Sequence, residues 1–415
     1  MRGELAPFTE AGARFVALAE EHAADFATRA GDHDREGSFP SENIQALQKS
    51  GFMGAPVPVD LGGMGLETPH DLMVGMSRLA RGCASTAIAS NMHITGAYAI
   101  TRLWRRAVAS GEPRATVMES TLRAVGQGRL VMCFPTTEPG SDLASPMVEG
   151  TARDDGYALN GLKIFGTLSL VANLFLPTFR FLREDGDYGV ANGVVLRDTP
   201  GMQILDDWDS LGMRASGSNS VSFKDCFIPK ASAFETGGTW GVFGAAAIEI
   251  ALGPNMSLVS TFLGIAESAH GIAVDSTVVR KKGPRGKRMA ERIPIQQLVA
   301  EMEIDLATMR AVIERTGRFA GEFSSKYGPG EAPDDEAHAM MKEFQCMKYV
   351  VNRKAIDVVD RAMTVVGGSA YMAKSPLSRL YRDARAGPFM QPFAPYEALE
   401  YIGKVALGED PVLDR

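Results

Sequence analysis

The spacing of apolar residues changes twice along the chain, and this double change limits the possible folds more than any other feature. In the first part, apolar side chains recur every three or four residues, as in helices that bury one face. Short alternating segments separated by turn-forming residues follow, and the helical spacing then returns. Long helices are expected in this last part over Gly253–Val279, Ile295–Ser325 and Asp334–Val366. The sequence therefore predicts an α+β chain with an N-terminal helical domain over residues 1–125, a middle β domain over 126–235 and a C-terminal four-helix-bundle domain over 236–415.

Composition and missing motifs narrow the class of protein. A length of 415 residues exceeds one ordinary core, and 45% apolar residues supply enough material for two or three. The net charge of −7 disfavours a nucleic-acid binder, which needs a broad basic face. The phosphate-loop, zinc-protease, paired-cysteine and Rossmann motifs are lacking, so we expect neither a metal site nor a nicotinamide site.

The cysteines and the hydropathy pattern bear on cellular location. The four cysteines, at positions 83, 133, 226 and 346, are too far apart in sequence for metal-ligand or redox spacing, which is typical of reduced, buried thiols. The first seven residues contain no apolar signal core, and we count no apolar run of the roughly 18 residues that a membrane span requires. We therefore expect a cytoplasmic protein without a membrane partner.

The middle block contains two turn signals and one segment that suggests ligand binding. Asp154–Gly156 and Asn160–Gly161 are typical of hairpin turns. A strand is expected directly after the second turn, and its alternation would place Lys163, Phe165 and Thr167 on one face. An aromatic ring beside a hydroxyl is suited to stack on a flat ligand and to hydrogen-bond its edge.

Three further segments combine glycine with small polar residues. Phe134–Leu143 follows a strand with hydroxyls and free backbone N–H groups, suited to a polar ring edge or a carbonyl oxygen. Leu211–Ser218 adds the cation of Arg214 to a similar turn. Val365–Tyr371 contains the pair Gly367–Gly368, which ends a long helix and permits close approach of a ligand or another chain. Taken singly, each segment is also compatible with an ordinary loop or helix end.

Together, in this order and layout, the four segments resemble the acyl-CoA dehydrogenase family from about residue 10 to about residue 405. The loop Val57–Gly65, which reads V-P-x-x-x-G-G-x-G, and the helical segment Phe262–Ala266 are similar to that family as well. The resemblance implies a flavoprotein that binds FAD between the middle domain and the C-terminal bundle. It also implies a homotetramer or homodimer.

The resemblance implies roles for individual residues. Thr167 would hydrogen-bond the reactive nitrogen of the flavin ring, and Phe165 would cover the face of the ring. Ser141 would lie on the substrate or the flavin side of the pocket. The edge of the flavin would be lined by residues of the first turn, which are Phe134, Thr136 and Thr137.

A second group of implied contacts concerns the other half of FAD. Gly367 and Gly368 would approach the adenine from a neighbouring subunit. Arg280 begins a basic stretch between two bundle helices, and its charge would suit the pyrophosphate. A solvated basic loop would explain the same stretch.

The implied reaction is the removal of a proton next to the carbonyl of an acyl thioester of CoA or a carrier protein. A hydride would pass to the flavin, and an acceptor flavoprotein would take the electrons. The base must be a carboxylate with a raised pKa. An ungapped count from Arg382 puts the base position at Gln391, whereas a short insertion would put it at Glu397. An alternative position on the first bundle helix falls near Asn255, a turn or more from Glu249.

Two other functions stay open at this point. A flavin-dependent monooxygenase on the same fold would take reduced flavin from a partner reductase, would lack the glutamate and would often use a histidine. His93, on a helix expected to face the flavin pocket, is the candidate, although a lone histidine on an apolar helix is more often a core residue. A flavin binder without catalytic activity is the third function, because Gln391 cannot take a proton.

Overall fold

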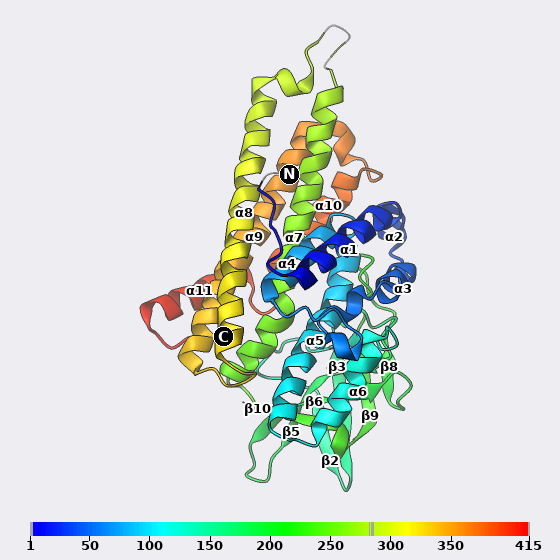
Figure 1. Cartoon of the computed structure of the whole chain (residues 1–415), viewed down its shortest axis with the longest axis vertical. Helices are drawn as coiled ribbons and strands as arrows, with labels where there is room; N and C mark the ends of the chain where they lie inside the picture. The colour runs from blue at the N-terminus through cyan, green and yellow to red at the C-terminus, as the bar shows by residue number, and fades with distance from the viewer. Residues whose placement is uncertain (1–2, 282, 284–285, 414–415) are drawn as a thin grey trace.

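The computed structural model describes residues 3–281, 283 and 286–413, and its three parts follow the predicted order (Figure 1). Six α-helices and two short 3-10 turns form the N-terminal part of the described chain. They are α1 (Glu10–Phe26), α2 (Ala30–Glu36), α3 (Ser41–Lys49), η1 (Phe52–Gly54), η2 (Val59–Leu61), α4 (Pro69–Ala80), α5 (Ala84–Ala109) and α6 (Arg114–Gly126).

Side-chain caps define two of these helix starts. Thr9 Oγ1 accepts the Gly12 N–H at 2.9 Å at the start of α1. Thr68 Oγ1 accepts the Asp71 N–H at 3.2 Å at the start of α4, where Pro69 occupies the first helical position. These bonds satisfy N–H groups that have no partner within the helix, so both helices begin where the local sequence directs.

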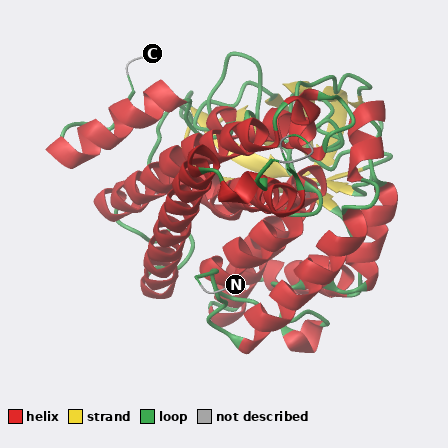
Figure 2. Ribbon diagram, turned by 90° about the horizontal axis from the view of Figure 1, so that it is seen from above, coloured by secondary structure: helices red, strands yellow, loops and turns green. Residues whose placement is uncertain are grey.

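The middle part is built from ten short strands of the described residues. They are β1 (Met132–Cys133), β2 (Glu149–Arg153), β3 (Gly156–Lys163), β4 (Leu174–Phe175), β5 (Thr178–Leu182), β6 (Tyr188–Gly193), β7 (Val195–Leu196), β8 (Met202–Ile204), β9 (Val221–Pro229) and β10 (Ala233–Thr239). Seven form a sheet in the order β10-β6-β5-β2-β3-β9-β8, and three form a small sheet in the order β1-β4-β7. Figure 2 shows the strands gathered in one region beside the helices.

One predicted hairpin turn is present and the other is wrong. Asp154–Gly156 connects β2 and β3 as expected. Asn160–Gly161 instead lies inside β3, where the pairing with β9 shifts register between Leu159 and Gly161. Gly161 has φ +141°, so the turn-like dipeptide marks a bulge in a continuous strand.

The predicted common face of Lys163, Phe165 and Thr167 is also wrong. Strand β3 ends at Lys163, and Phe165 has φ +54°, a backbone conformation that interrupts any alternation. The side chain of Lys163 is fully buried, whereas Phe165 is 56% exposed. Lys163 therefore lies within the β domain, and Phe165 lies on its surface.

Five α-helices follow in the described C-terminal part: α7 (Ala245–Val279), α8 (Ile293–Lys326), α9 (Asp334–Val366), α10 (Pro376–Ala384) and α11 (Pro395–Leu407). Helix α9 has the predicted bounds. Helix α7 begins earlier than the predicted Gly253, because the chain stays helical through Pro254. Asn91 Nδ2 of α5 donates to the Pro254 carbonyl at 2.8 Å and so ties α7 to α5 at the proline, whose missing N–H leaves the Ile250 carbonyl without its helical donor.

Helix α7 also corrects the expectation that no segment is apolar enough to cross a membrane. Residues Ala247–Val279 are long and apolar enough to cross a membrane, by length and composition alone. Of the most apolar window, 72% is buried inside the protein. That burial is typical of the core helix of a bundle, and α7 packs against α9, α4 and α5.

Candidate active site

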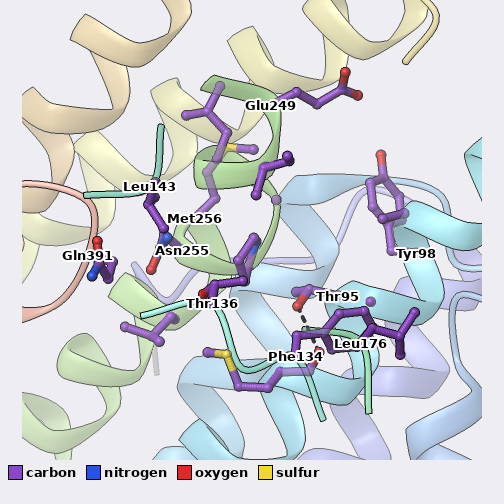
Figure 3. Close-up of a pocket in the computed structure, with 18 of the residues that line it drawn as sticks. Thr95, Tyr98, Phe134, Thr136, Leu143, Leu176, Glu249, Asn255, Met256 and Gln391 are labelled. Carbon is purple, nitrogen blue, oxygen red and sulfur yellow. Dashed lines mark hydrogen bonds between the residues drawn. The ribbon is translucent and has the colours of Figure 1, made fainter. Parts of the chain in front are cut away.

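A cavity of about 950 Å³ lies where the β domain meets the N-terminal helices and the bundle. Its walls come from α4, α5, α6, strands and loops of the β domain, the first turns of α7, the ends of α8 and α9 with the loop between them, and α10. Figure 3 shows labelled side chains from α5, from loops of the β domain, from α7 and from the loop after α10 arranged around one space. Five residues predicted at the flavin line this cavity, namely Phe134, Thr136, Thr137, Phe165 and Thr167.

The loop that carries Thr136 and Thr137 is held from inside the β domain by a buried ion pair. Lys163 Nζ contacts the Glu138 carboxylate and donates to the Thr136 carbonyl at 3.2 Å. Glu138 also accepts the backbone N–H of Val148 at 3.0 Å. Burial lowers the pKa of Lys163 to about 8. The buried pair of Lys163 and Glu138 therefore holds the loop of Thr136 and Thr137 in position.

A row of hydroxyls continues the same wall. Thr167 Oγ1 is 2.9 Å from Ser218 Oγ, which is 2.7 Å from Ser216 Oγ. Phe165 meets Trp208 edge-on, with ring centroids 6.0 Å apart. All five side chains line the cavity, so one wall combines aromatic surface with hydrogen-bonding groups.

Asp383 of α10 attaches the segment Leu211–Ser218 to the bundle. This side chain is almost fully buried and accepts the Met213 N–H at 2.7 Å. Gly212 fits directly against α10, because a Cβ atom there would lie 2.2 Å from the Arg382 carbonyl oxygen. Burial raises the pKa of Asp383 to about 6.

Replacing Asp383 by asparagine should remove one source of pH-dependent stability. The folded protein retains the proton of Asp383 at a pH where the unfolded chain has lost it, so stability falls as pH rises from about 4 to about 6. A shift of about two pKa units corresponds to an effect on the order of 2–3 kcal/mol. The asparagine side chain would stay neutral and could still accept from Met213.

Urea unfolding at several pH values measures the effect. Asp209→Asn, at a side chain that is 94% exposed, is the control and should keep the wild-type slope.

Two neutral amides lie near the Thr137 end of the cavity. Gln391, from the loop after α10, donates from Nε2 to Thr137 Oγ1 at 3.3 Å. Asn255, on α7 directly after Pro254, donates from Nδ2 to the Ala251 carbonyl at 2.7 Å. Figure 3 shows both on the same side of the cavity as Thr136.

The other end of the cavity is closed by charged contacts. Glu249 pairs with Arg102 at 3.2 Å and accepts the Gly330 N–H of the α8–α9 loop. Arg102 also donates to the Tyr327 carbonyl at 2.9 Å. Burial raises the pKa of Glu249. Figure 3 shows Glu249 and Tyr98 away from Asn255 and Gln391.

Ser141 and His93 do not line the cavity. Ser141 Oγ donates to carbonyls within its own turn. His93 is fully buried, and its Nδ1 accepts the Met132 N–H at 3.0 Å. Burial lowers the pKa of His93 to about 3, so the imidazole is neutral and supports the start of β1.

Glu397, the predicted base, also lies outside the cavity lining. Its carboxylate accepts the Ala394 N–H at 2.7 Å and thereby caps the first turn of α11. The structure does not bring Glu397 together with the predicted flavin contacts. The residue that reaches the cavity is Gln391, the position found by the ungapped count.

Arg280, Gly367 and Gly368 form a separate group. Arg280 follows α7 and donates to the Val366 carbonyl, directly before the glycine pair that follows α9. None of the three lines the cavity of its own chain. Their contact with an adenine across a subunit boundary stays a prediction.

The residues at the cavity fit a flavin. A planar ring needs apolar faces and a polar edge, which Phe134, Phe165 and the threonine hydroxyls supply. A phosphate needs a cation at the rim, where Arg385 lies with its Cζ 4.6 Å from the Phe389 ring centroid.

Several lining residues had no predicted role, namely Tyr98, Arg102, Trp208, Ser216, Ser218 and Met256. The serines belong to the segment singled out around Arg214, so their role could have been proposed from the sequence. Tyr98 and Arg102 lie one turn apart on α5 and carry no distinguishing local motif. Only the packing of α5 against α7 brings them to the cavity.

Comparison with known proteins agrees with the layout. Profiles for the N-terminal, middle and C-terminal domains of acyl-CoA dehydrogenase match residues 9–105, 133–226 and 256–391. The L-evernosamine nitrososynthase of Micromonospora sp. is 35% identical over 98% of this chain and 92% of its own length. The amino sugar nitrososynthase DnmZ of Streptomyces peucetius is 32% identical over 97% of this chain and 95% of its own.

A solved structure is similar over nearly the whole chain. KijD3, in complex with FMN and dTDP-3-amino-2,3,6-trideoxy-4-keto-3-methyl-D-glucose, has a TM-score of 0.89 and is 33% identical to this chain. The match covers 98% of this chain and 96% of KijD3. The three family profiles and the similarity to relatives over nearly the full length show where the chain belongs, and the order of its parts agrees with them. The chain is a member of the acyl-CoA dehydrogenase family of flavoprotein oxidoreductases.

Proposed function

We propose that the protein is a flavin-dependent monooxygenase that oxidises the primary amine of a nucleotide-linked amino sugar. The observation that carries this proposal is the neutral end of the cavity, where Gln391 contacts Thr137 and Asn255 lies nearby. A dehydrogenase needs a carboxylate to remove a proton next to a carbonyl. Amides cannot perform that step, but they can bind an amine.

Similarity to named relatives supports the substrate class. Two relatives over 30% identical are described as nitrososynthases, one of them of amino sugars. KijD3 was solved with a nucleotide-linked amino sugar and FMN. We therefore propose an amino sugar nucleotide as the substrate and FMN or FAD as the flavin, supplied in reduced form by a separate reductase.

The proposed oxidation of the amine takes place in two rounds, and each round consumes one O₂ and one reduced flavin. In the first, the amine, O₂ and reduced flavin give a hydroxylamine, one water and oxidised flavin. In the second, the hydroxylamine, O₂ and reduced flavin give a nitroso group, two waters and oxidised flavin. The bound flavin supplies the electrons that activate O₂. The protein's own contribution is to orient the amine, through the amides of Gln391 and Asn255, and to limit the entry of water.

Oxidation of a defined amine tests the proposal. The purified protein would be supplied with O₂, a flavin reductase and NADH, and either FMN or FAD. With the KijD3 ligand as substrate, mass spectrometry should detect first the gain of one oxygen atom and then the nitroso sugar. Omission of the reductase should abolish the product. Formation of peroxide alone, with the amino sugar recovered unchanged, would refute the proposal.

The same preparation distinguishes thioester dehydrogenation. We expect no anaerobic bleaching of the bound oxidised flavin by a series of acyl-CoA thioesters, because the cavity presents Gln391 where a base is required. Bleaching that is lost in Glu397→Gln would instead establish a dehydrogenase with Glu397 as its base.

A further inference from the structure

The amides of Asn255 and Gln391, near Thr137, each present an oxygen without a hydrogen-bond donor among the described residues. Asn255 is 6% exposed, and its Nδ2 is engaged by the Ala251 carbonyl in its own helix. The Nε2 of Gln391 is engaged by Thr137. One N–H of each amide thus has a partner, and the two carbonyl oxygens, Asn255 Oδ1 and Gln391 Oε1, have no donor among the described residues and are available as acceptors at the cavity.

Side chains from two other helices hold the backbone next to both amides. Pro254 interrupts the bonding of α7 next to Asn255, and Asn91 of α5 satisfies the carbonyl of Pro254 at 2.8 Å. The loop of Gln391 is held by Lys348 of α9, which donates to the Phe393 carbonyl at 2.5 Å. These supports come from different helices and hold the backbone beside two amides that both line the cavity.

The acids lining the cavity are placed elsewhere. Among the described residues, these are Glu249 and Glu235. Glu249 is occupied by Arg102 and lies six residues before Asn255 on α7, a rise of about 9 Å. Glu235 is an exposed residue of β10. Neither Glu249 nor Glu235 is therefore placed to pair with an ammonium ion held at the two amides.

The cations around the cavity outnumber these acids. Arg382 pairs with Asp34, and Arg385 lies over Phe389. The other ionisable lining residues, on α5 and α6, are Tyr98, Arg102, Arg106 and Arg114. Arg102, Arg106, Arg114 and Arg382 are each paired with an acid, namely Glu249, Glu331, Glu112 and Asp34. Among the described lining residues, the exposed Glu235 is therefore the one carboxylate without an arginine partner, and the amide end offers none to stabilise an ammonium ion.

We propose that Asn255 and Gln391 bind the reacting nitrogen as the neutral amine, through Oδ1 and Oε1, and thereby exclude the ammonium form. This inference rests on the proposed function. A primary amine has two N–H groups and one lone pair, and N–O bond formation uses the lone pair. Two amide oxygens accept the two N–H groups and leave the lone pair free. A carboxylate would instead stabilise the ammonium ion, which has no lone pair. The proton that the amine loses on binding goes to solvent.

The sharpest test measures proton release when the substrate binds. Isothermal titration of the flavin-free protein with the dTDP-linked amino sugar, in two buffers of different ionisation enthalpy, gives the number of protons released. The wild type should release a proton near neutral pH. Gln391→Glu and Asn255→Asp should release less, because a carboxylate next to an amine raises the amine pKa by about 1–3 units.

Turnover should change in step with binding. In both acidic variants, kcat/KM should fall about tenfold or more at neutral pH and recover at higher pH, since each pKa unit changes the neutral fraction about tenfold. Gln391→Met should lower activity equally at all pH values, because it removes an acceptor without adding charge. The control is Gln203→Glu, which makes the same chemical change at an exposed residue of β8 and should leave both profiles unchanged.

The outcomes separate the two proposals. Amine oxidation by the wild type without proton release on binding would overturn this inference and leave the proposed function intact. An unshifted pH profile in both acidic variants would overturn it as well. A wild type that binds and oxidises no amine, while it binds flavin, would overturn the proposed function and this inference with it.

Discussion

Replacement of Lys163 by methionine is expected to lower the free energy of unfolding by about 3–5 kcal/mol, the cost of leaving a buried carboxylate without its partner. Lys163 is fully buried, and its ammonium contacts Glu138, the Thr136 carbonyl and Thr178 Oγ1, the last at 3.1 Å. Removal of this group leaves the Glu138 charge uncompensated inside the β domain. Urea unfolding measures the loss, and flavin fluorescence titration should reveal weaker binding as the loop of Thr136 shifts.

Two further variants give this expectation its controls. Lys163→Met combined with Glu138→Gln removes both charges, and should recover part of the lost stability because the glutamine amide oxygen can still accept the Val148 N–H. Lys354→Met breaks a more exposed ion pair with Asp305 in the bundle and should cost at most about 1 kcal/mol without changing flavin affinity. A Lys163→Met protein as stable as Lys354→Met would refute the importance of the buried pair.

This ion pair links the β domain to the chemistry of the cavity. Glu138 directly follows Thr137, whose hydroxyl meets Gln391 from the bundle. The polar wall is therefore fixed on one side by a charge pair inside the sheet and on the other by a loop between α10 and α11. Because the Lys163–Glu138 pair and Lys348, which holds this loop, are buried, the amide at Gln391 is preorganised before a substrate arrives.

The fold could be predicted from the sequence where local signals coincide with packing. Helix α9 has its predicted bounds because Pro333 and Gly367 border a continuous helical pattern. Helix α7 was predicted too short because Gly253 and Pro254 together are typical of a break. Its packing against α9 and α4, with Asn91 at the proline site, outweighs that local signal.

The site could be predicted only in part. The threonines of the first turn and Thr167, which line the cavity, were found because their segments resemble those of the acyl-CoA dehydrogenase family in order and layout. Gln391 and Asn255 are far apart in sequence, and their shared position results from tertiary packing. The assignment of Glu397 required a choice of gap, and only the structure identifies it as a helix cap. The face predicted for Lys163 was wrong because the positive φ of Phe165 carries no clear signal in the sequence.

The contact between α4 and α7 leads to a second large effect. Gly264 of α7 lies directly against α4, and a Cβ atom there would be 2.2 Å from the Ser77 carbonyl oxygen and 2.8 Å from Ala80 Cβ. Backbone cannot move aside as a flexible side chain can. Gly264→Ala should therefore separate the two helices and cost about 3 kcal/mol, at the upper end of the range for overpacked cores.

Gly271, two turns later on the same helix, provides the matched control. A Cβ atom at Gly271 would have no neighbour within 4 Å. Because alanine loses less backbone entropy than glycine on forming a helix, Gly271→Ala should stabilise the protein by about 0.5–1 kcal/mol. The same chemical change should thus have opposite signs at two positions of α7, as measured by urea unfolding. Equal effects at both positions would mean that helix propensity, and not the approach of α4, determines the stability of α7. Since Pro69 and Leu72 of α4 also line the cavity, Gly264→Ala should weaken flavin binding and Gly271→Ala should not.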